Sequence, residues 1–169
     1  MRSVLLLAGA VVVLSAMLVA GATRAADAGT KGAAMKGAAS VHAEGSFEVK
    51  ITPIAADAGS APPRMAVEKV WHGDIEGTSR AEMMTAMGSV KDSGAYVAVE
   101  RFTGAVLGRR GSFLLVHRGI MTRGRQDLSI TVVPDSGTDA LQGLEGSVTI
   151  RIDPDRKHFY VLDGTLPGN

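Results

Sequence analysis

Two side chains that can exchange protons lie in alternating runs of otherwise apolar residues. Tyr96–Thr122 reads YVAVERFTGAVLGRRGSFLLVHRGIMT, and Glu100 and His117 share a face with Phe102 and Leu115. A buried carboxylate and a buried imidazole can form a general acid/base pair, because burial and mutual pairing shift their pKa values in opposite directions. Two other interpretations stay open: a structural ion pair, and a polar grip on a mostly apolar ligand.

The turn between the two runs predicts how close these side chains lie. Gly108–Gly111 reads GRRG and predicts a two-residue hairpin loop in which the two glycines oppose each other. In that register His117 faces Phe102, and Glu100 faces Gly119, which leaves room for the carboxylate side chain. Glu100 is then the diagonal neighbour of His117, roughly 5–8 Å away by sheet geometry.

Four further side chains fall on inward faces of other predicted strands. The simpler interpretation of Lys69 is a surface lysine whose stem lies along apolar groups. The simpler interpretation of Tyr160 is plain core packing. If the interior holds a ligand, however, all four are candidates to contact it: Lys69, Trp71, His158 and Tyr160.

No metal or cofactor is expected. His72, Asp74 and Glu76 share one strand face, but successive side chains there are too far apart to meet one ion, so a solvated face is predicted. The chain has no Cys, no Gly-x-Ser-x-Gly elbow, no phosphate-binding glycine loop and no His-Glu-x-x-His. Whether the protein is an enzyme is left open by these motifs.

The N-terminus predicts export. One arginine precedes an apolar run over Val4–Ala22, and small residues follow, so residues 1–25 resemble a secretory signal peptide with cleavage after Ala22 or Ala25. The run is also long enough to remain as a membrane anchor, which is the alternative. Cleavage would leave a periplasmic or extracellular protein without a stable anchor and, having no Cys, without disulfides.

Composition divides the remaining chain into a linker and one domain. Residues 26–43 are rich in Gly, Ala, Ser and Lys and predict a flexible linker, and residues 44–169 suffice for a single domain. Removing Arg2 and Arg24 changes the formal net charge from +1 to −1, with 16 basic and 17 acidic residues left. A near-neutral domain with scattered charges is not expected to bind nucleic acid, and the oligomeric state is not predicted.

Period-two hydrophobicity dominates the domain and predicts an all-β fold. The segment 80–90 also fits a helix capping box with methionines at helical spacing, but we predict a strand there. Short turns joining eight strands favour an up-and-down barrel or a sandwich. The predicted strands are approximately 44–52, 64–76, 80–90, 95–104, 112–121, 128–133, 143–152 and 158–166.

The motifs HGDIEGTS, VERFTG, GSFLLVHRG, MTRG and VVPDSGT, in this order, resemble the bacterial domain-of-unknown-function 3224 (DUF3224) family over residues 44–167. The resemblance implies an eight-stranded antiparallel meander barrel like that of allene oxide cyclase, and it implies no function, because the family has none assigned. One departure is Val161–Gly164, where the family usually carries acidic and aromatic residues. If an aromatic residue there lines a cavity mouth, Gly164 opens that mouth.

The expected function is binding of a small, mostly apolar molecule inside the barrel, with Glu100 and His117 as its polar contacts. An isomerase or cyclase that uses this pair is the first alternative, by analogy with the enzyme that gives the barrel its name. A structural or envelope-stress protein with a filled interior is the second, because eight-stranded barrels are either filled by side chains or hold one small ligand.

Overall fold

The structure is a computed structural model that describes residues 37–55 and 62–168 of the chain. The predicted signal peptide, the first part of the predicted linker and the choice of cleavage site lie outside these residues, so export stays a prediction. Within the described residues, no helix is long and apolar enough to cross a membrane.

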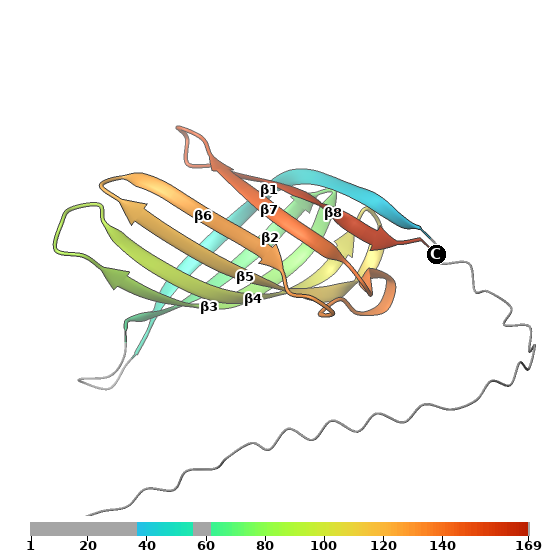
Figure 1. Ribbon diagram of the computed structural model, residues 1–169, viewed down its shortest axis with the longest axis horizontal. Helices are drawn as coiled ribbons and strands as arrows, with labels where there is room; N and C mark the ends of the chain where they lie inside the picture. Colours follow the sequence, from blue (N-terminus) through green and yellow to red (C-terminus); the bar gives the residue numbers. More distant parts are fainter. Residues whose placement is uncertain (1–36, 56–61, 169) are drawn as a thin grey trace, which may run out of the picture. The chain divides into compact units, whose positions relative to one another are not determined.

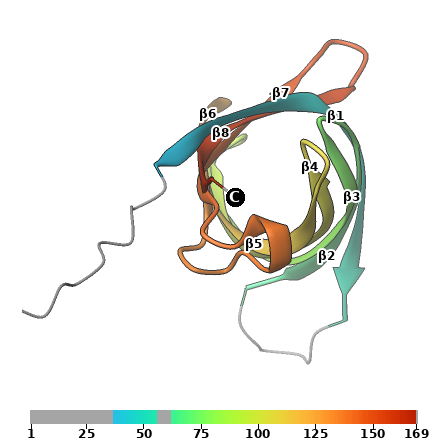
Figure 2. The same cartoon turned by 90° about the vertical axis from the view of Figure 1, so that its right-hand side faces the viewer.

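Eight antiparallel strands close into a barrel in chain order, with β8 paired to β1 (Figures 1 and 2). This confirms the predicted all-β meander, including a strand in the methionine segment. A short 3-10 helix, η1 (Asp139–Leu141), is the only helical element of the described chain. The strands are β1 (Ala38–Ile54), β2 (Arg64–Gly73), β3 (Ile75–Met87), β4 (Gly94–Val106), β5 (Arg109–Thr122), β6 (Arg125–Val132), β7 (Glu145–Ile152) and β8 (His158–Pro167).

The first strand begins earlier than the predicted domain boundary at Glu44. Residues from Ala38 onward pair with β8 up to Pro167, and Val41 and Ala43 are buried. The late half of β8 needs a partner on this side for the ring to close, and these residues supply it. Small alanines on both faces concealed the alternation, so the segment resembled the linker before it.

The predicted strand over residues 64–76 is two strands. β2 ends at Gly73 and β3 begins at Ile75, with Asp74 between them. Gly73 has a φ of 105°, a left-handed conformation that glycine adopts at little cost. The expected inward face is nevertheless confirmed, because Lys69, Trp71 and Ile75 are all buried.

The β4–β5 hairpin turns two residues earlier than predicted. Leu107 and Gly108 form the loop with φ of 49° and 77°, so the turn has positive φ at both central residues. Arg109 starts β5, where its guanidinium donates to the carbonyls of Ala140 and Pro167. These contacts give the arginine a place in the sheet that a loop position would lack.

The earlier turn changes the predicted register. Glu100 faces Leu115 rather than Gly119, and His117 faces Ala98 rather than a phenylalanine. The shift moves the pairing by an even number of residues, so every side chain keeps its face. Glu100 and His117 therefore remain inward and remain diagonal neighbours, as the sequence predicted.

The core fills one end of the barrel, which we call the filled end. It contains the β2–β3 and β4–β5 turns and the β6–β7 connection, which is hydrogen-bonded to β5 through Ser112 and Thr138. Leu141 and Leu144 of that connection are fully buried and close this end. Large buried residues of the filled end include Trp71, Phe102, Val106, Phe113, Ile130, Tyr160, Leu162 and Leu166.

The contact between β6 and β7 is the shortest strand pairing of the ring. Thr131 and Ser147 are its single register pair, whereas each of the other neighbouring strands shares at least eight. The β5–β6 and β7–β8 hairpins point in different directions beyond it (Figure 1). The end opposite the core, the cavity end, is thus held less tightly along this seam.

Candidate functional site

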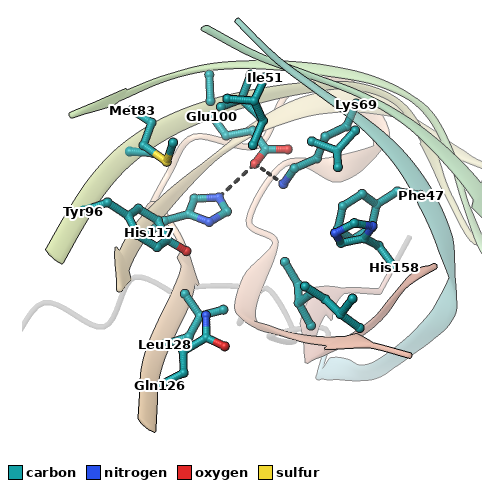
Figure 3. Close-up of a pocket in the computed structure, with 16 residues that line it drawn as sticks. Phe47, Ile51, Lys69, Met83, Tyr96, Glu100, His117, Gln126, Leu128 and His158 are labelled. Atoms are coloured by element: carbon teal, nitrogen blue, oxygen red, sulfur yellow. Dashed lines mark hydrogen bonds and ion pairs between the residues drawn. The ribbon is translucent and has the colours of Figure 1, made fainter. Parts of the chain in front are cut away.

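A cavity of about 310 Å³ occupies the cavity end of the barrel, and all eight strands contribute to its wall (Figure 3). Most of the wall is apolar. Lys69, Glu100 and His117 form its polar base, next to the filled core, and the other polar side chains of the wall are Tyr96, Gln126 and His158. The apolar wall includes Val49, Ile51, Met83, Ala98, Leu128, Ile150 and Ile152.

Glu100 lies at the centre of the polar base and is 1% exposed. Its Oε2 accepts a hydrogen bond from Lys69 Nζ at 2.7 Å, and its Oε1 accepts one from Ser79 Oγ at 2.5 Å. The Oε2 atom also lies 2.8 Å from His117 Nε2. Ser79 Oγ in turn accepts a hydrogen bond from Trp71 Nε1 at 2.9 Å, which ties the site to the filled core.

These contacts fix the charge of Glu100. Burial alone would raise the pKa of this carboxyl, but the contact with His117, the charge and hydrogen bond of Lys69 and the hydrogen bond from Ser79 outweigh burial and lower the pKa to about 2. Glu100 is therefore a carboxylate at every ordinary pH. It can orient and stabilise its neighbours, but it cannot act as a general acid.

His117 presents one edge to Glu100 and the other to the cavity. Its Nε2 contacts Oε2 at ion-pair distance and has no hydrogen-bond partner among the described residues. The other ring nitrogen, Nδ1, is turned away from Glu100 (Figure 3). Because the nitrogen beside a carboxylate carries the hydrogen, a neutral ring offers the Nδ1 lone pair to the cavity.

The interpretation of Lys69 as a surface lysine is wrong. Its side chain is 7% exposed and points into the barrel toward Glu100. The ammonium also lies 4.9 Å from the ring centroid of Phe47 and 5.2 Å from that of Trp71. A carboxylate on one side and two aromatic faces on the other compensate the loss of water around this charge.

Two half-buried aromatic side chains complete the polar lining. His158 stacks on Phe47, with ring centroids 5.1 Å apart. Tyr96 lies on the same inward face of β4 as Glu100, and burial, with the charge of Glu100, raises the pKa of its hydroxyl. Its ring covers Gly119, the residue paired with it on β5, so the space predicted there for Glu100 is taken by Tyr96. Tyr96 was not among the predicted candidates; its inward parity could have indicated it, but the predicted register placed Gly119 opposite Glu100 instead.

Trp71 and Tyr160 lie outside the cavity wall. Trp71 acts on the site through Ser79, which accepts from its indole N–H, and through its ring face beside the Lys69 ammonium. The Tyr160 hydroxyl accepts from the Ile75 amide at 2.8 Å and donates to the His72 carbonyl at 3.2 Å, and burial is the main cause that raises its pKa to about 12. Both residues pack in the filled end and neither lines this cavity, so their role as ligand contacts stays a prediction.

Gly164 does not open the cavity mouth. It lies at the filled end, where it pairs with Gly146 on β7 and with Val41 on β1. A side chain at Gly164 would meet the Glu145 carbonyl oxygen, so the position requires glycine for close strand approach. The departure from the family pattern at Val161–Gly164 therefore affects how closely the strands pack and does not affect the cavity mouth.

Across residues 37–55 and 62–168, no group of three or more His, Asp and Glu side chains is placed to hold a metal ion. The surface carboxylate Asp74 instead accepts a hydrogen bond from the Glu44 amide at the β2–β3 turn.

Comparison with known proteins decides the family. The profile of the family described as "Protein of unknown function (DUF3224)" matches residues 43–163, from within β1 to within β8. The chain belongs to the DUF3224 family. A crystal structure of a DUF3224 protein of unknown function from Shewanella oneidensis MR-1 is 39% identical to it, with a TM-score of 0.68. That alignment covers 78% of this chain and 100% of the other. No curated protein matches the chain.

Membership confirms the resemblance that the motifs predicted, and DUF3224 brings no assigned activity with it. Those motifs supply the site: VERFTG contains Glu100, and GSFLLVHRG contains His117. The chemistry of this DUF3224 protein must therefore be argued from its own cavity.

The Glu100 pKa predicts how stability depends on pH. The folded value lies below the unfolded value of 4.5, so the carboxylate contributes stability above pH 4.5 that is lost as the pH falls toward 2. The full contribution is about 3 kcal/mol. Urea unfolding between pH 6 and pH 2.5 should show a shallower decline for Glu100→Gln than for the wild type. The exposed carboxyl variant Glu76→Gln should follow the wild type, and a Glu100→Gln curve parallel to it would contradict the assignment.

A double-mutant cycle tests the buried pair directly. Lys69→Met and Glu100→Gln should each destabilise the fold by about 3 kcal/mol, because each leaves one charge buried without its partner. The double variant should cost less than the sum of the two, since neither charge then remains. The free energies of unfolding come from urea titrations at pH 7. Additive effects would mean that the two groups do not stabilise each other.

Proposed function

We propose that this protein binds a small, mostly apolar molecule in the cavity, with a polar group of that molecule facing His117. The observation that carries the proposal is an apolar-walled cavity of about 310 Å³ with ordered polar groups at its base. Ligand pockets range from roughly 300 to 1,000 Å³, so this one suits a small ligand. As part of the proposal, the resemblance of residues 1–25 to a signal peptide supports binding outside the cytoplasm.

The unused hydrogen-bonding groups indicate the polar end of the ligand. Glu100 is saturated by its neighbours, whereas His117 Nδ1, the Tyr96 hydroxyl and the His158 ring have no hydrogen-bond partner among the described residues. Together they offer a lone pair and a hydroxyl donor in the lining of the cavity. A hydroxyl or carbonyl group at one end of an apolar skeleton matches this set.

The cavity favours binding over a purely structural role. A barrel that serves only as a scaffold gains stability when its interior is filled, as it is at the filled end here. The cavity end instead leaves the apolar side chains Val49, Met83, Leu128 and Ile150 only partly buried. Covering such surface would stabilise a complex by burying apolar area.

A second candidate is proton transfer within the bound molecule. The observation that favours it is the placement of His117, whose Nε2 faces a permanent carboxylate while Nδ1 faces the cavity. A general base is held in this way by a carboxylate behind it. His117 would take a proton from a carbon next to a carbonyl and return it to another carbon of the same molecule. No atom or electron is gained or lost, so this isomerisation requires no cofactor.

Filling the cavity tests the binding proposal. Ala98 lies in the wall and points inward, so Ala98→Phe should occupy the space a ligand needs. Titration with the apolar fluorophore anilinonaphthalene sulfonate should give one site in the wild type and an affinity lowered about tenfold or more in Ala98→Phe, because the added phenyl ring occupies space that the probe needs. Ala105→Phe, on the outer face of the same strand, is the matched control. Equal affinities for all three proteins would contradict the proposal.

Isotope exchange tests the enzyme candidate. A molecule that native mass spectrometry finds retained by the wild-type protein should gain deuterium when it is incubated with that protein in D₂O. His117→Gln should abolish the exchange, because the amide cannot accept and return the proton. Retained binding by this variant, measured by the same mass spectrometry, separates loss of chemistry from loss of the ligand. No exchange with the wild type would leave binding alone as the function.

A further inference from the structure

Two hairpin ends beside the cavity carry large apolar side chains that face solvent. Met87 and Val90, near the β3–β4 turn, are 75% and 47% exposed, and Ile120 and Met121, near the β5–β6 turn, are 39% and 41% exposed. We call these four residues the apolar rim. Single exposed apolar residues are ordinary, but a cluster bordered by polar groups marks an interaction site.

The two hairpin ends form one unit. The Gly124 amide donates to the Asp92 carbonyl at 2.9 Å, and the Arg123 amide donates to Ser93 Oγ at 3.0 Å. Figure 1 shows the two ends side by side at the far left of the barrel. Their backbones hold the apolar rim in place, so a partner would meet an ordered surface and not two independent loops.

Basic side chains lie beside the apolar rim. Lys91, Arg123 and Arg125 are exposed at the same two turns, and none has an ion-pair partner among the described residues. Nearby Asp127 is neutralised by Arg118 at 3.0 Å, which leaves Asp92 as the unpaired carboxylate of the two turns. Three cations against one anion, set around apolar side chains, complement an anionic lipid surface.

The apolar rim leads into the cavity. A second hollow of about 330 Å³ is lined by Met87, Ile120 and Met121, and its wall is almost entirely apolar. It shares Met83 and Tyr96 with the cavity that contains Glu100 and His117. A molecule leaving an apolar phase at the rim would therefore meet a mostly apolar wall, interrupted by Tyr96 and Gln126, on its way to the polar base.

We propose that the cavity end of the barrel docks on an anionic lipid bilayer, with the apolar rim in the interface and Lys91, Arg123 and Arg125 on the headgroups. The bilayer is then the source or destination of the cavity ligand, a step that rests on the proposed binding function. The docking itself rests only on the rim and its charges.

A local probe at the rim tests docking with the full chain. Because the chain has no Cys, Val90→Cys carries a single polarity-sensitive fluorophore, and Val99→Cys, 56% exposed on the outer face of β4, is the matched control. Vesicles with equal parts of phosphatidylglycerol and phosphatidylcholine should shift the emission at residue 90 to the blue and leave residue 99 unchanged. Vesicles of phosphatidylcholine alone should bind the protein at least about tenfold more weakly, since they carry no net surface charge.

Charge reversal and ligand binding complete the test. Arg123→Glu with Arg125→Glu should weaken the response to anionic vesicles about tenfold or more. Docking would be overturned by an equal emission shift at residues 90 and 99, or by no shift at residue 90. It would also be overturned by a shift that grows with protein concentration in the absence of vesicles, because that would show a second copy of the chain on the rim. Anilinonaphthalene sulfonate titration separates the two proposals, because failure of docking leaves cavity binding intact, and failure of cavity binding leaves the vesicle response intact.

Discussion

A carboxylate inside an aromatic barrel must be compensated by its neighbours, and the placement of several other side chains follows from that requirement. Glu100 can stay charged because Lys69, Ser79 and His117 surround it. Each of these is constrained in turn: Lys69 lies between aromatic rings, and Ser79 receives the indole N–H of Trp71. Removing water from two opposite charges is costly, so such a network adds little net stability compared with apolar residues of the same volume. Here it specifies the orientation of one imidazole edge toward a cavity.

The network also marks the boundary between two halves with different properties. On one side aromatic and aliphatic side chains pack around Phe102 and Tyr160, and the β6–β7 connection closes the end with Leu141. On the other side the same strands continue around the open cavity, and Thr131 and Ser147 are the single register pair of β6 and β7. The filled end therefore contributes most of the stability of the fold, and the cavity end does not need to be tightly packed. Binding sites often occupy the less stable part of a fold for this reason.

The alternation of inward and outward side chains along each strand explains which parts of the site the sequence alone could predict. Alternation placed Glu100 and His117 on one inward face, and that conclusion survived a wrong hairpin register because the error was an even number of residues. Lys69 was misjudged because a lysine on an inward face is compensated by partners distant in sequence, which no local pattern reveals. The early start of β1 at Ala38 was missed because alanines suit both faces of a strand. Tyr96 was overlooked because the predicted register paired Gly119 with Glu100, whereas in the structure Gly119 lies opposite Tyr96 and leaves room for its ring.

Because the number of strands is even, both ends of the barrel domain lie away from the cavity mouth. A meander of eight strands returns the chain to the side on which it began, so the chain enters at Ala38 and leaves at Pro167 as neighbours at the filled end. The β3–β4, β5–β6 and β7–β8 turns lie at the opposite end, around the mouth of the cavity. A tether, tag or fused domain at either terminus would therefore leave the mouth clear. Within such a family, loops at the mouth can lengthen or change composition independently of whatever the termini are joined to.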